Sequence, residues 1–197
     1  MIRDESIHQY LTRLGSGEPT PGGGATGSVQ LALGAGLLSM AARFSDREDL
    51  ARHCLRVAED ALEVADQDES RFEATAEAFG LPQDTERQRQ VRSDRIQQVL
   101  EGAVVPPQRM VAGCAELLRA AQAVLDDCNP NVLSDVGAAV GAVRAGLTAA
   151  VLTLETNLTA LKDEPARRSV AQDLESADRL ADRAEDLIRQ VREQIGG

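Results

Sequence analysis

Apolar residues recur every three or four positions along nearly the whole chain, and no stretch alternates as a β-strand does. This spacing predicts helices over residues 4–14, 24–44, 47–79, 84–125, 132–161 and 164–195. Pro106 and Pro107 interrupt the fourth segment, because proline lacks an amide hydrogen and forces a kink or a break. The last segment is charged apart from a narrow apolar stripe, so it should lie on the outside. We therefore expect an all-α fold, a single-domain antiparallel bundle of about six helices over residues 1–197.

The composition favours closely packed helices. Hydrophobic residues make up 43% of the chain and aromatic residues only 2%, so Ala, Leu, Val and Gly must build the core. The formal net charge of −11 argues against nucleic acid or an anionic membrane surface as a partner. Residues 25–42 are long enough to span a membrane, but they include Thr26, Ser28, Gln30 and Ser39, which favours a buried helix of a soluble protein.

The three cysteines and two histidines give no sign of a metal site. Cys54, Cys114 and Cys128 are widely spaced, which fits reduced thiols in a cytoplasmic protein. His8 and His53 are not spaced from each other, or from any cysteine, as the ligands of a metal site are, so we expect no metal. The charged first ten residues, MIRDESIHQY, do not resemble a signal peptide.

One carboxylate interrupts an apolar stripe. In residues 47–79 the stripe passes through Ala61 and Val64 and continues at Phe72, yet position 68 holds Asp68. A carboxylate that faces inward is costly unless it is paired or used. Asp68 is therefore either the structural partner of an arginine on another helix or a functional group. The acids around it fall off the stripe and should face solvent: Glu59, Asp60, Glu63, Asp66 and Glu69.

The segment after Asn129-Pro130-Asn131 has a second face of small residues, which begins at Asp135 and ends at Thr153 and Asn157. Small side chains allow another helix or a flat ligand to approach the backbone. Asp135 is a candidate catalytic carboxylate, although the helix dipole also favours an acid near a helix start. Asn129 or Ser134 would serve equally as a simple N-cap.

Three glycines, Gly22, Gly23 and Gly24, follow a proline where a helix is about to begin. Without side chains, they leave backbone N–H groups bare at the positive end of a helix, which suits a carboxylate or a phosphate. The stretch is neither a Walker motif nor a GxGxxG motif after a strand. The alternative is a flexible turn into a closely packed helix.

Several short motifs follow one another along the chain: PTPGGG (19–24), DQDESRF (66–72), FGLP (79–82), Arg92, VPP (105–107), NPNVLSDVGAA (129–139) and Asn157-Leu158. In their order and spacing, these motifs resemble the cyclodeaminase/cyclohydrolase family of folate enzymes over roughly residues 5–163. The chain differs from the family's usual pattern in FSDREDL (residues 44–50), at Gln83 and at Thr153-Leu154.

The resemblance implies an all-α homodimer that acts on bridged tetrahydrofolates, with a folate substrate and no cofactor. The reaction is hydrolysis of 5,10-methenyltetrahydrofolate to 10-formyltetrahydrofolate, or alternatively the cyclodeaminase reaction, in which 5-formiminotetrahydrofolate closes its ring and releases ammonia. A third alternative, motivated by Gln83 and Thr153, is a helical protein that binds folate or a protein partner without catalysis.

For hydrolysis, Asp135 would be the general base that takes a proton from the attacking water. Asp68 would hold the pterin N–H groups or carry a second proton, and Asn131 and Ser134 would position the water or the pterin edge. The glutamate carboxylates of the substrate would bind the backbone at Gly22, Gly23 and Gly24 and the side chain of Arg92.

Overall fold

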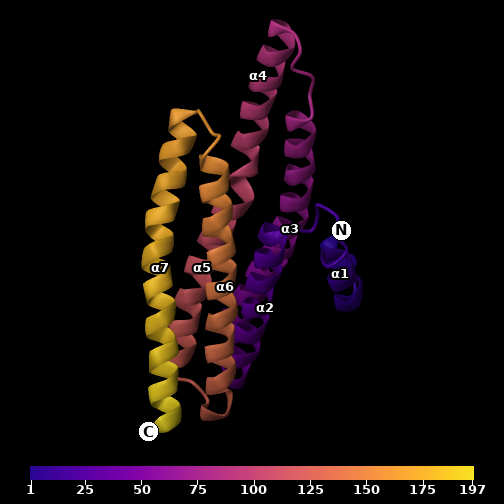
Figure 1. Ribbon diagram of the computed structural model, residues 1–197. Helices are drawn as coiled ribbons and strands as arrows, with labels where there is room; N and C mark the ends of the chain where they lie inside the picture. The colour runs from indigo at the N-terminus through magenta and orange to yellow at the C-terminus, as the bar shows by residue number, and fades with distance from the viewer.

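The computed structural model describes residues 1–197, in seven α-helices and two short 3-10 turns. The long helices run alternately up and down, which confirms the all-α antiparallel bundle (Figure 1). The elements are η1 (Ile2–Asp4), α1 (Ile7–Leu14), α2 (Gly23–Phe44), α3 (Glu48–Phe79), α4 (Glu86–Ala103), α5 (Val105–Leu125), η2 (Pro130–Val132), α6 (Leu133–Leu158) and α7 (Glu164–Gly196).

The segment predicted at residues 84–125 is two helices, and the break falls at Val104 rather than at the prolines. Pro106 and Pro107 lie in the first turn of α5. The first amides of a helix have no intrahelical partner, so the missing N–H costs nothing there. The two prolines therefore begin a helix, and this accounts for the seventh one.

Close backbone contacts hold α2 in the middle of the bundle, where it packs on α3, α5 and α6. A β-carbon on Gly146 of α6 would lie 2.8 Å from the carbonyl oxygen of Gly27 on α2. One on Gly34 would lie 2.9 Å from Cγ2 of Val143. Glycine is required at these contacts, so the small-residue face of α6 is used to approach α2. The helix α7 covers α5 and α6 from outside, as predicted.

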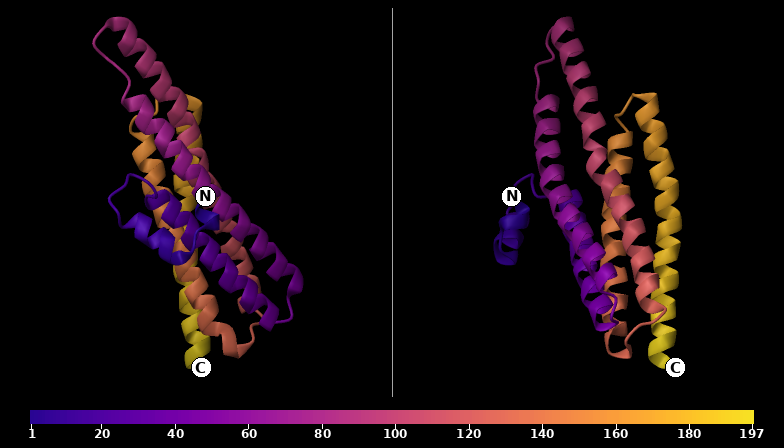
Figure 2. Two further views of the ribbon diagram at one scale, coloured as in Figure 1. Left: turned by 90° about the vertical axis from the view of Figure 1, so that its right-hand side faces the viewer. Right: turned by 180° about the vertical axis from the view of Figure 1, so that it is seen from behind.

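The helices α3 and α4 extend past the other helices as a two-helix arm (Figures 1 and 2). The apolar stripe of α3 loses its cover there. Phe72 is 48% exposed and Phe79 is 46% exposed, so the prediction that the inward-facing stripe continues at Phe72 is wrong. Helical periodicity indicates which face is apolar, but it does not indicate how far the neighbouring helices reach.

The N-terminal segment lies outside the bundle, against α2 and α3 (Figure 2). Tyr10 of α1 is buried, and its hydroxyl lies 2.9 Å from Oγ1 of Thr26. In contrast, Ile7 and Leu11 on the same helix are 77% and 58% exposed. The helix α1 is therefore amphipathic, but most of its apolar face is uncovered in a single chain.

Two acids of α3 anchor this segment and do not form the solvated face that we expected. Asp66 accepts hydrogen bonds from the backbone N–H of Ile2 at 2.6 Å and from Nε of Arg3 at 2.7 Å. Glu69 forms an ion pair with Arg13. Both acids have partners that lie more than 50 residues away in the sequence, and a local pattern cannot indicate such partners.

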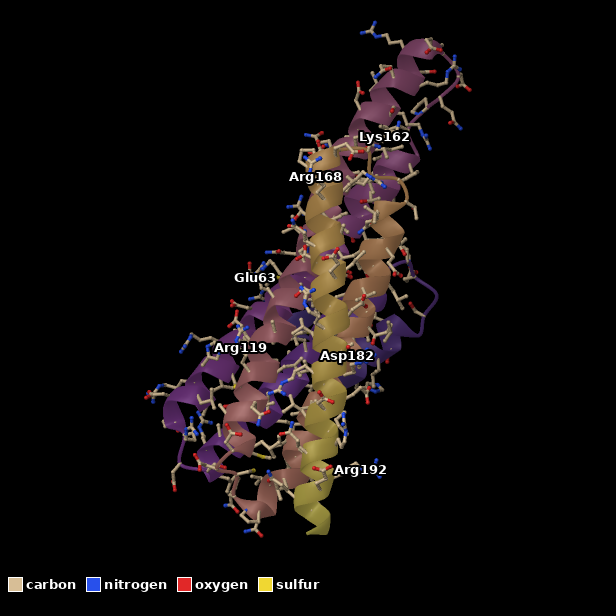
Figure 3. The ribbon with its side chains drawn as sticks, turned by 90° about the vertical axis from the view of Figure 1, so that its left-hand side faces the viewer. Glu63, Arg119, Lys162, Arg168, Asp182 and Arg192 are labelled. Atoms are coloured by element: carbon tan, nitrogen blue, oxygen red, sulfur yellow. The ribbon has the colours of Figure 1, made fainter.

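By length and composition alone, α2 and residues Pro130–Leu158 are apolar enough to cross a membrane. Within the bundle, both helices bury part of their surface against one another. Charged side chains also cover the face formed by α7, α5 and α3 along its full length, from Lys162 at one end to Arg192 at the other (Figure 3). That face therefore offers no charge-free belt for lipid.

Candidate functional site

At the N-terminus of α2, the side chain of Asp68 occupies the space beside Gly24. A β-carbon on Gly24 would lie 2.6 Å from Oδ2 and 2.7 Å from Cγ of Asp68, so only glycine leaves room for the carboxylate. Asp68 reaches this position from the middle of α3, on the side of that helix that faces α2. The carboxylate therefore lies at the positive end of the α2 dipole.

Burial raises the pKa of the Asp68 carboxyl, and the charge of Glu69 adds to the rise. The backbone N–H of Ala25 donates to the carboxylate and lowers the pKa, but burial is the larger effect. Asp68 has no arginine partner, so it is not the structural ion pair that we considered from the sequence. A half-buried acid whose pKa is raised toward neutrality can carry a proton in a reaction.

The other two glycines have a different environment. A β-carbon on Gly22 or Gly23 would have no atom within 4 Å, so packing within the chain does not require glycine at either position. The N–H groups of Gly23 and Gly24 lie in the first turn of α2 and have no partner inside the helix. The start of α2 thus presents bare backbone donors to any group that approaches from outside.

Two more side chains, one from α3 and one from α6, reach the same region. Arg71 lies one turn beyond Asp68 on α3, and its Nη1 is 2.9 Å from where a β-carbon of Gly102 on α4 would be. Asn157 of α6 donates from Nδ2 to the carbonyl oxygen of Ala103 at 3.1 Å. Our sequence analysis did not single out Arg71, although its spacing of three from Asp68 places the two on adjacent positions of one helical face.

The second predicted group lies at the opposite end of α2. Asn129, just before η2, donates from Nδ2 to the carbonyl oxygen of Phe44 at 3.0 Å, which fixes the start of α6 beside the end of α2. Asn129 also caps η2 by accepting from the N–H of Asn131, whereas Ser134 is exposed and caps nothing. Asp135 is half-buried in the first turn of α6.

Within one chain, the structure does not bring Asp68 and Asp135 together. They lie near opposite ends of α2, a helix of 22 residues that is about 30 Å long. Arg92 lies in a third place, on the arm. There it donates to the carbonyl oxygen of Phe79 at 3.0 and 3.3 Å, and its guanidinium lies 5.7 Å from the ring centre of Phe79.

A half-open cavity of about 160 Å³ lies elsewhere, between α2, α3 and α5. Leu31, Val57 and Met110 are among its apolar lining residues, and Arg109 and Glu116 are among its charged ones. A cavity of this size holds about one aromatic ring. It therefore cannot enclose a substrate with several rings, and we do not assign the reaction to it.

Two of the three thiols are buried and unreactive. Burial raises the pKa of Cys54 to about 11 and that of Cys114 to about 12, so both are protonated at neutral pH. No group of three or more His, Cys, Asp and Glu side chains is arranged to hold a metal ion. The groups that lie near the start of α2 are a carboxylate, backbone amides, an amide side chain and an arginine.

Residues 6–176 match the family described as formiminotransferase-cyclodeaminase. The chain is 32% identical to the methenyltetrahydrofolate cyclohydrolase of Methylorubrum extorquens, and the alignment covers 89% of each protein. It is 27% identical to the formimidoyltransferase-cyclodeaminase of Mus musculus over 83% of this chain but 32% of that protein, so it spans about a third of the mammalian relative.

A solved structure shares the fold along its whole length. The formiminotetrahydrofolate cyclodeaminase of Thermotoga maritima superimposes with a TM-score of 0.81 and covers 100% of this chain and 98% of that one. The two sequences are 22% identical, so this likeness shows the arrangement of helices alone.

Proposed function

The chain belongs to the formiminotransferase-cyclodeaminase family, and on that premise we propose that it hydrolyses 5,10-methenyltetrahydrofolate to 10-formyltetrahydrofolate. The observation that carries this proposal is Asp68, a carboxylate with a raised pKa beside the glycine-opened start of α2. The relative that is 32% identical, and matched over nearly its full length, bears the name of this activity. The three free cysteines agree with a cytoplasmic location, which we propose as well.

The reaction needs three proton transfers. The oxygen of a water attacks the carbon of the cationic methenyl bridge, and a general base takes one of the water's protons. The hydroxyl group of the adduct then loses its proton as it becomes the formyl carbonyl, the bond from the carbon to N5 breaks, N5 receives a proton, and the formyl group stays on N10. Since a cation and water give a neutral product, one proton is released overall. Two carboxylates with different pKa values can divide these roles.

We assign the base to Asp135 and the proton donor for N5 to Asp68. Burial raises the pKa of Asp68 above that of an ordinary aspartate, and this direction supports the assignment because it favours the protonated form that a donor needs. In the same proposal, Asn131 and Ser134 position the water or the pterin edge. The negative charge of Asp135 would also stabilise the cationic bridge.

This assignment requires a second copy of the chain, and an uncovered apolar surface supports a homodimer. The helix α2 has no charged residue before Arg43, yet Leu33 and Phe44 on it are each 59% exposed. Ile7 and Leu11 of α1 add to the exposed apolar area, as does Leu152 of α6 at 57%. A helix that is apolar all round is normally covered on every side.

Gly36, in the middle of α2, supports the same interface. A β-carbon on Gly36 would have no atom within 4 Å, so nothing in the chain explains a residue that costs a helix about 0.5–1 kcal/mol relative to alanine. Gly27 and Gly34 on the same helix, by contrast, are required by contacts with α5 and α6. We infer that Gly36 lets the α2 helix of a second copy approach closely.

A two-fold axis across α2 would also complete the site. If the two α2 helices pair antiparallel, the end of one lies beside the start of the other. Asp135 of the partner subunit then comes near Asp68 and the bare amides of Gly23 and Gly24. Their placement near opposite ends of α2 within one chain becomes a reason for the dimer, which would contain two equivalent sites.

The cyclodeaminase reaction is the second candidate, because relatives of that name match most of this chain. The experiment that decides between the two measures both reactions with the purified protein. We expect the ultraviolet absorbance of the methenyl bridge to disappear faster with enzyme than without it, and 5-formiminotetrahydrofolate to release no ammonia above the background rate. Ammonia release alone would reverse the assignment, and folate binding without either reaction would favour the non-catalytic alternative.

A further inference from the structure

Two glycines near the start of α2 each make room for a charged side chain of α3. Gly24 accommodates the carboxylate of Asp68, and Gly102 in the last turn of α4 accommodates the guanidinium of Arg71. A β-carbon on Gly102 would lie 2.9 Å from Nη1 and 3.4 Å from Cζ of Arg71. Asp68 and Arg71 thus project from adjacent turns of one face of α3, an acid and then a base.

Arg71 differs from the other arginines near this face because its guanidinium has no partner. Arg3 forms an ion pair with Asp66, and Arg13 forms ion pairs with Glu5 and Glu69. Arg109, on α5, donates to the side chain of Gln67 at 2.9 Å. Arg71 forms neither an ion pair nor a side-chain hydrogen bond, and it is exposed.

Of the groups that we first expected to hold the anionic tail of a folate, Arg92 is occupied within the chain, whereas the amides of Gly23 and Gly24 remain bare. Arg92 donates to the carbonyl oxygen of Phe79 and lies over its ring. The N–H of Ala25, just after the three glycines, donates to Asp68. An anion that approaches the start of α2 therefore finds Arg71 as the free cation within one helical turn of Asp68.

We propose that Arg71 is a substrate-binding residue whose guanidinium binds a glutamyl carboxylate of the folate. The proposal rests on the proposed function, in which Asp68 lies at the methenyl bridge. From that bridge, the aminobenzoyl ring and one amide lead to the glutamate. Arg71 lies one turn along α3 from Asp68 and has a long side chain, so it is placed to meet that carboxylate. Because Gly102 has no side chain, it leaves room for the guanidinium at this place.

The test compares a folate that has the tail with one that lacks it. We would measure binding of 5-formyltetrahydrofolate and of tail-less 5-formyltetrahydropterin by titration calorimetry, together with methenyl hydrolysis. Arg71→Ala should weaken binding of the tailed compound about tenfold to a hundredfold, as expected for a lost charge-assisted hydrogen bond. Binding of the tail-less compound should change less than about twofold, since it never reaches the guanidinium. Arg87→Ala, which removes an exposed arginine of the arm, is the matched control and should change neither.

Gly102→Ala provides a second variant that keeps the charge. The new methyl group meets only the flexible end of Arg71, so the protein should fold while the guanidinium moves. We expect a smaller loss, of about threefold to tenfold, again confined to the tailed compound. Equal losses for both compounds, or no loss for either, would overturn the role of Arg71.

The outcomes also separate this inference from the proposed function. If the wild-type protein hydrolyses no methenyltetrahydrofolate but Arg71→Ala still selectively weakens binding of the tailed compound, Arg71 keeps its role and the proposed reaction is wrong. If hydrolysis is present and the variant binds both compounds as the wild type does, the reaction stands and the role of Arg71 is wrong. If the wild type binds neither compound, both are wrong.

Discussion

The carboxylate of Asp68 lies where a side chain at position 24 would be, with Oδ2 2.6 Å from the β-carbon position of Gly24. One glycine of the PGGG stretch is thus explained by an acid from another helix. A β-carbon on either of the two glycines before it would have no atom within 4 Å, and their backbone N–H groups remain available. Packing within the chain therefore requires glycine at position 24 but not at positions 22 and 23.

Gly24→Ala should destabilise the fold by about 1–3 kcal/mol, because the added methyl group would overlap the Asp68 carboxylate. It should also reduce turnover by displacing that group. Gly23→Ala is the matched control, since its methyl group enters open space and alanine suits a helix better than glycine by up to about 1 kcal/mol. Urea unfolding at one protein concentration compares the two. Equal changes in the free energy of unfolding for Gly24→Ala and Gly23→Ala would contradict this difference between the two positions.

Asp68→Asn should make the protein more stable at neutral pH. The pKa of Asp68 is higher in the folded than in the unfolded protein, so the folded state binds more protons between those two values. The contribution of Asp68 to the free energy of unfolding therefore falls as the pH rises through that range. Asparagine carries no charge, so the variant does not lose this stability at neutral pH. The gain should disappear below the unfolded pKa, where both states are protonated.

Urea midpoints at acidic and neutral pH test this prediction. Glu59→Gln, which neutralises an exposed acid of the same helix, is the control and should show no such gain. A lower midpoint for Asp68→Asn at neutral pH would mean that attraction to the α2 N-terminus outweighs the cost of burial.

Much of the fold follows from the sequence because helical periodicity is local. The expected segment 24–44 is α2 to within one residue, and the expected segment 47–79 is α3 to within one. Val104 was missed as a break because proline near a helix start and proline inside a helix look alike in the sequence. The exposure of Phe72 depends on where neighbouring helices end, which periodicity does not contain.

The site was harder to predict than the fold, for the same reason. The position of Asp68 on an apolar stripe indicated an unusual acid, and it is one. Its partner is the N–H of Ala25, 43 positions earlier in the chain. This pairing depends on how α2 and α3 pack, which a local pattern does not contain. The distance between Asp68 and Asp135 likewise appears only when α2 and α6 are placed in space.

Leu33→Asp should convert the proposed dimer to monomers, because a carboxylate buried at the centre of the proposed α2 interface would have no partner there. Leu55→Asp is the control. Leu55 is an exposed leucine of α3, 40% accessible, and lies outside the proposed interface. Light scattering over a dilution series measures the mass, and a dimer that survives Leu33→Asp as well as Leu55→Asp would rule out this interface.

Gly36→Ala gives a test whose sign differs between a monomer and a dimer. In a monomer, alanine would stabilise α2 by about 0.5–1 kcal/mol, because its methyl group meets nothing. At a close helix contact, the same methyl group would push the subunits apart. We expect Gly36→Ala to raise the free energy of unfolding of the separated subunit and to weaken its association into a dimer. Both are measured as functions of protein concentration.

The thiols should react in two classes. Cys54 and Cys114 are buried with raised pKa values of about 11 and about 12, whereas Cys128 is only partly buried. At pH 8, a chromogenic disulfide reagent should label one thiol per native chain within minutes and all three after unfolding. Cys128→Ser should abolish the native signal, and rapid labelling that persists in this variant would show that the core opens.

The most direct test of a site shared between two subunits is to mix two inactive variants. Asp68→Asn and Asp135→Asn should each abolish methenyl hydrolysis alone. After the subunits are exchanged, half of the dimers are hybrids, and each hybrid has one site with both acids intact. We predict recovery of about a quarter of the wild-type rate of methenyl absorbance loss. A mixture that stays inactive, although mass measurement shows that hybrids have formed, would contradict the shared site.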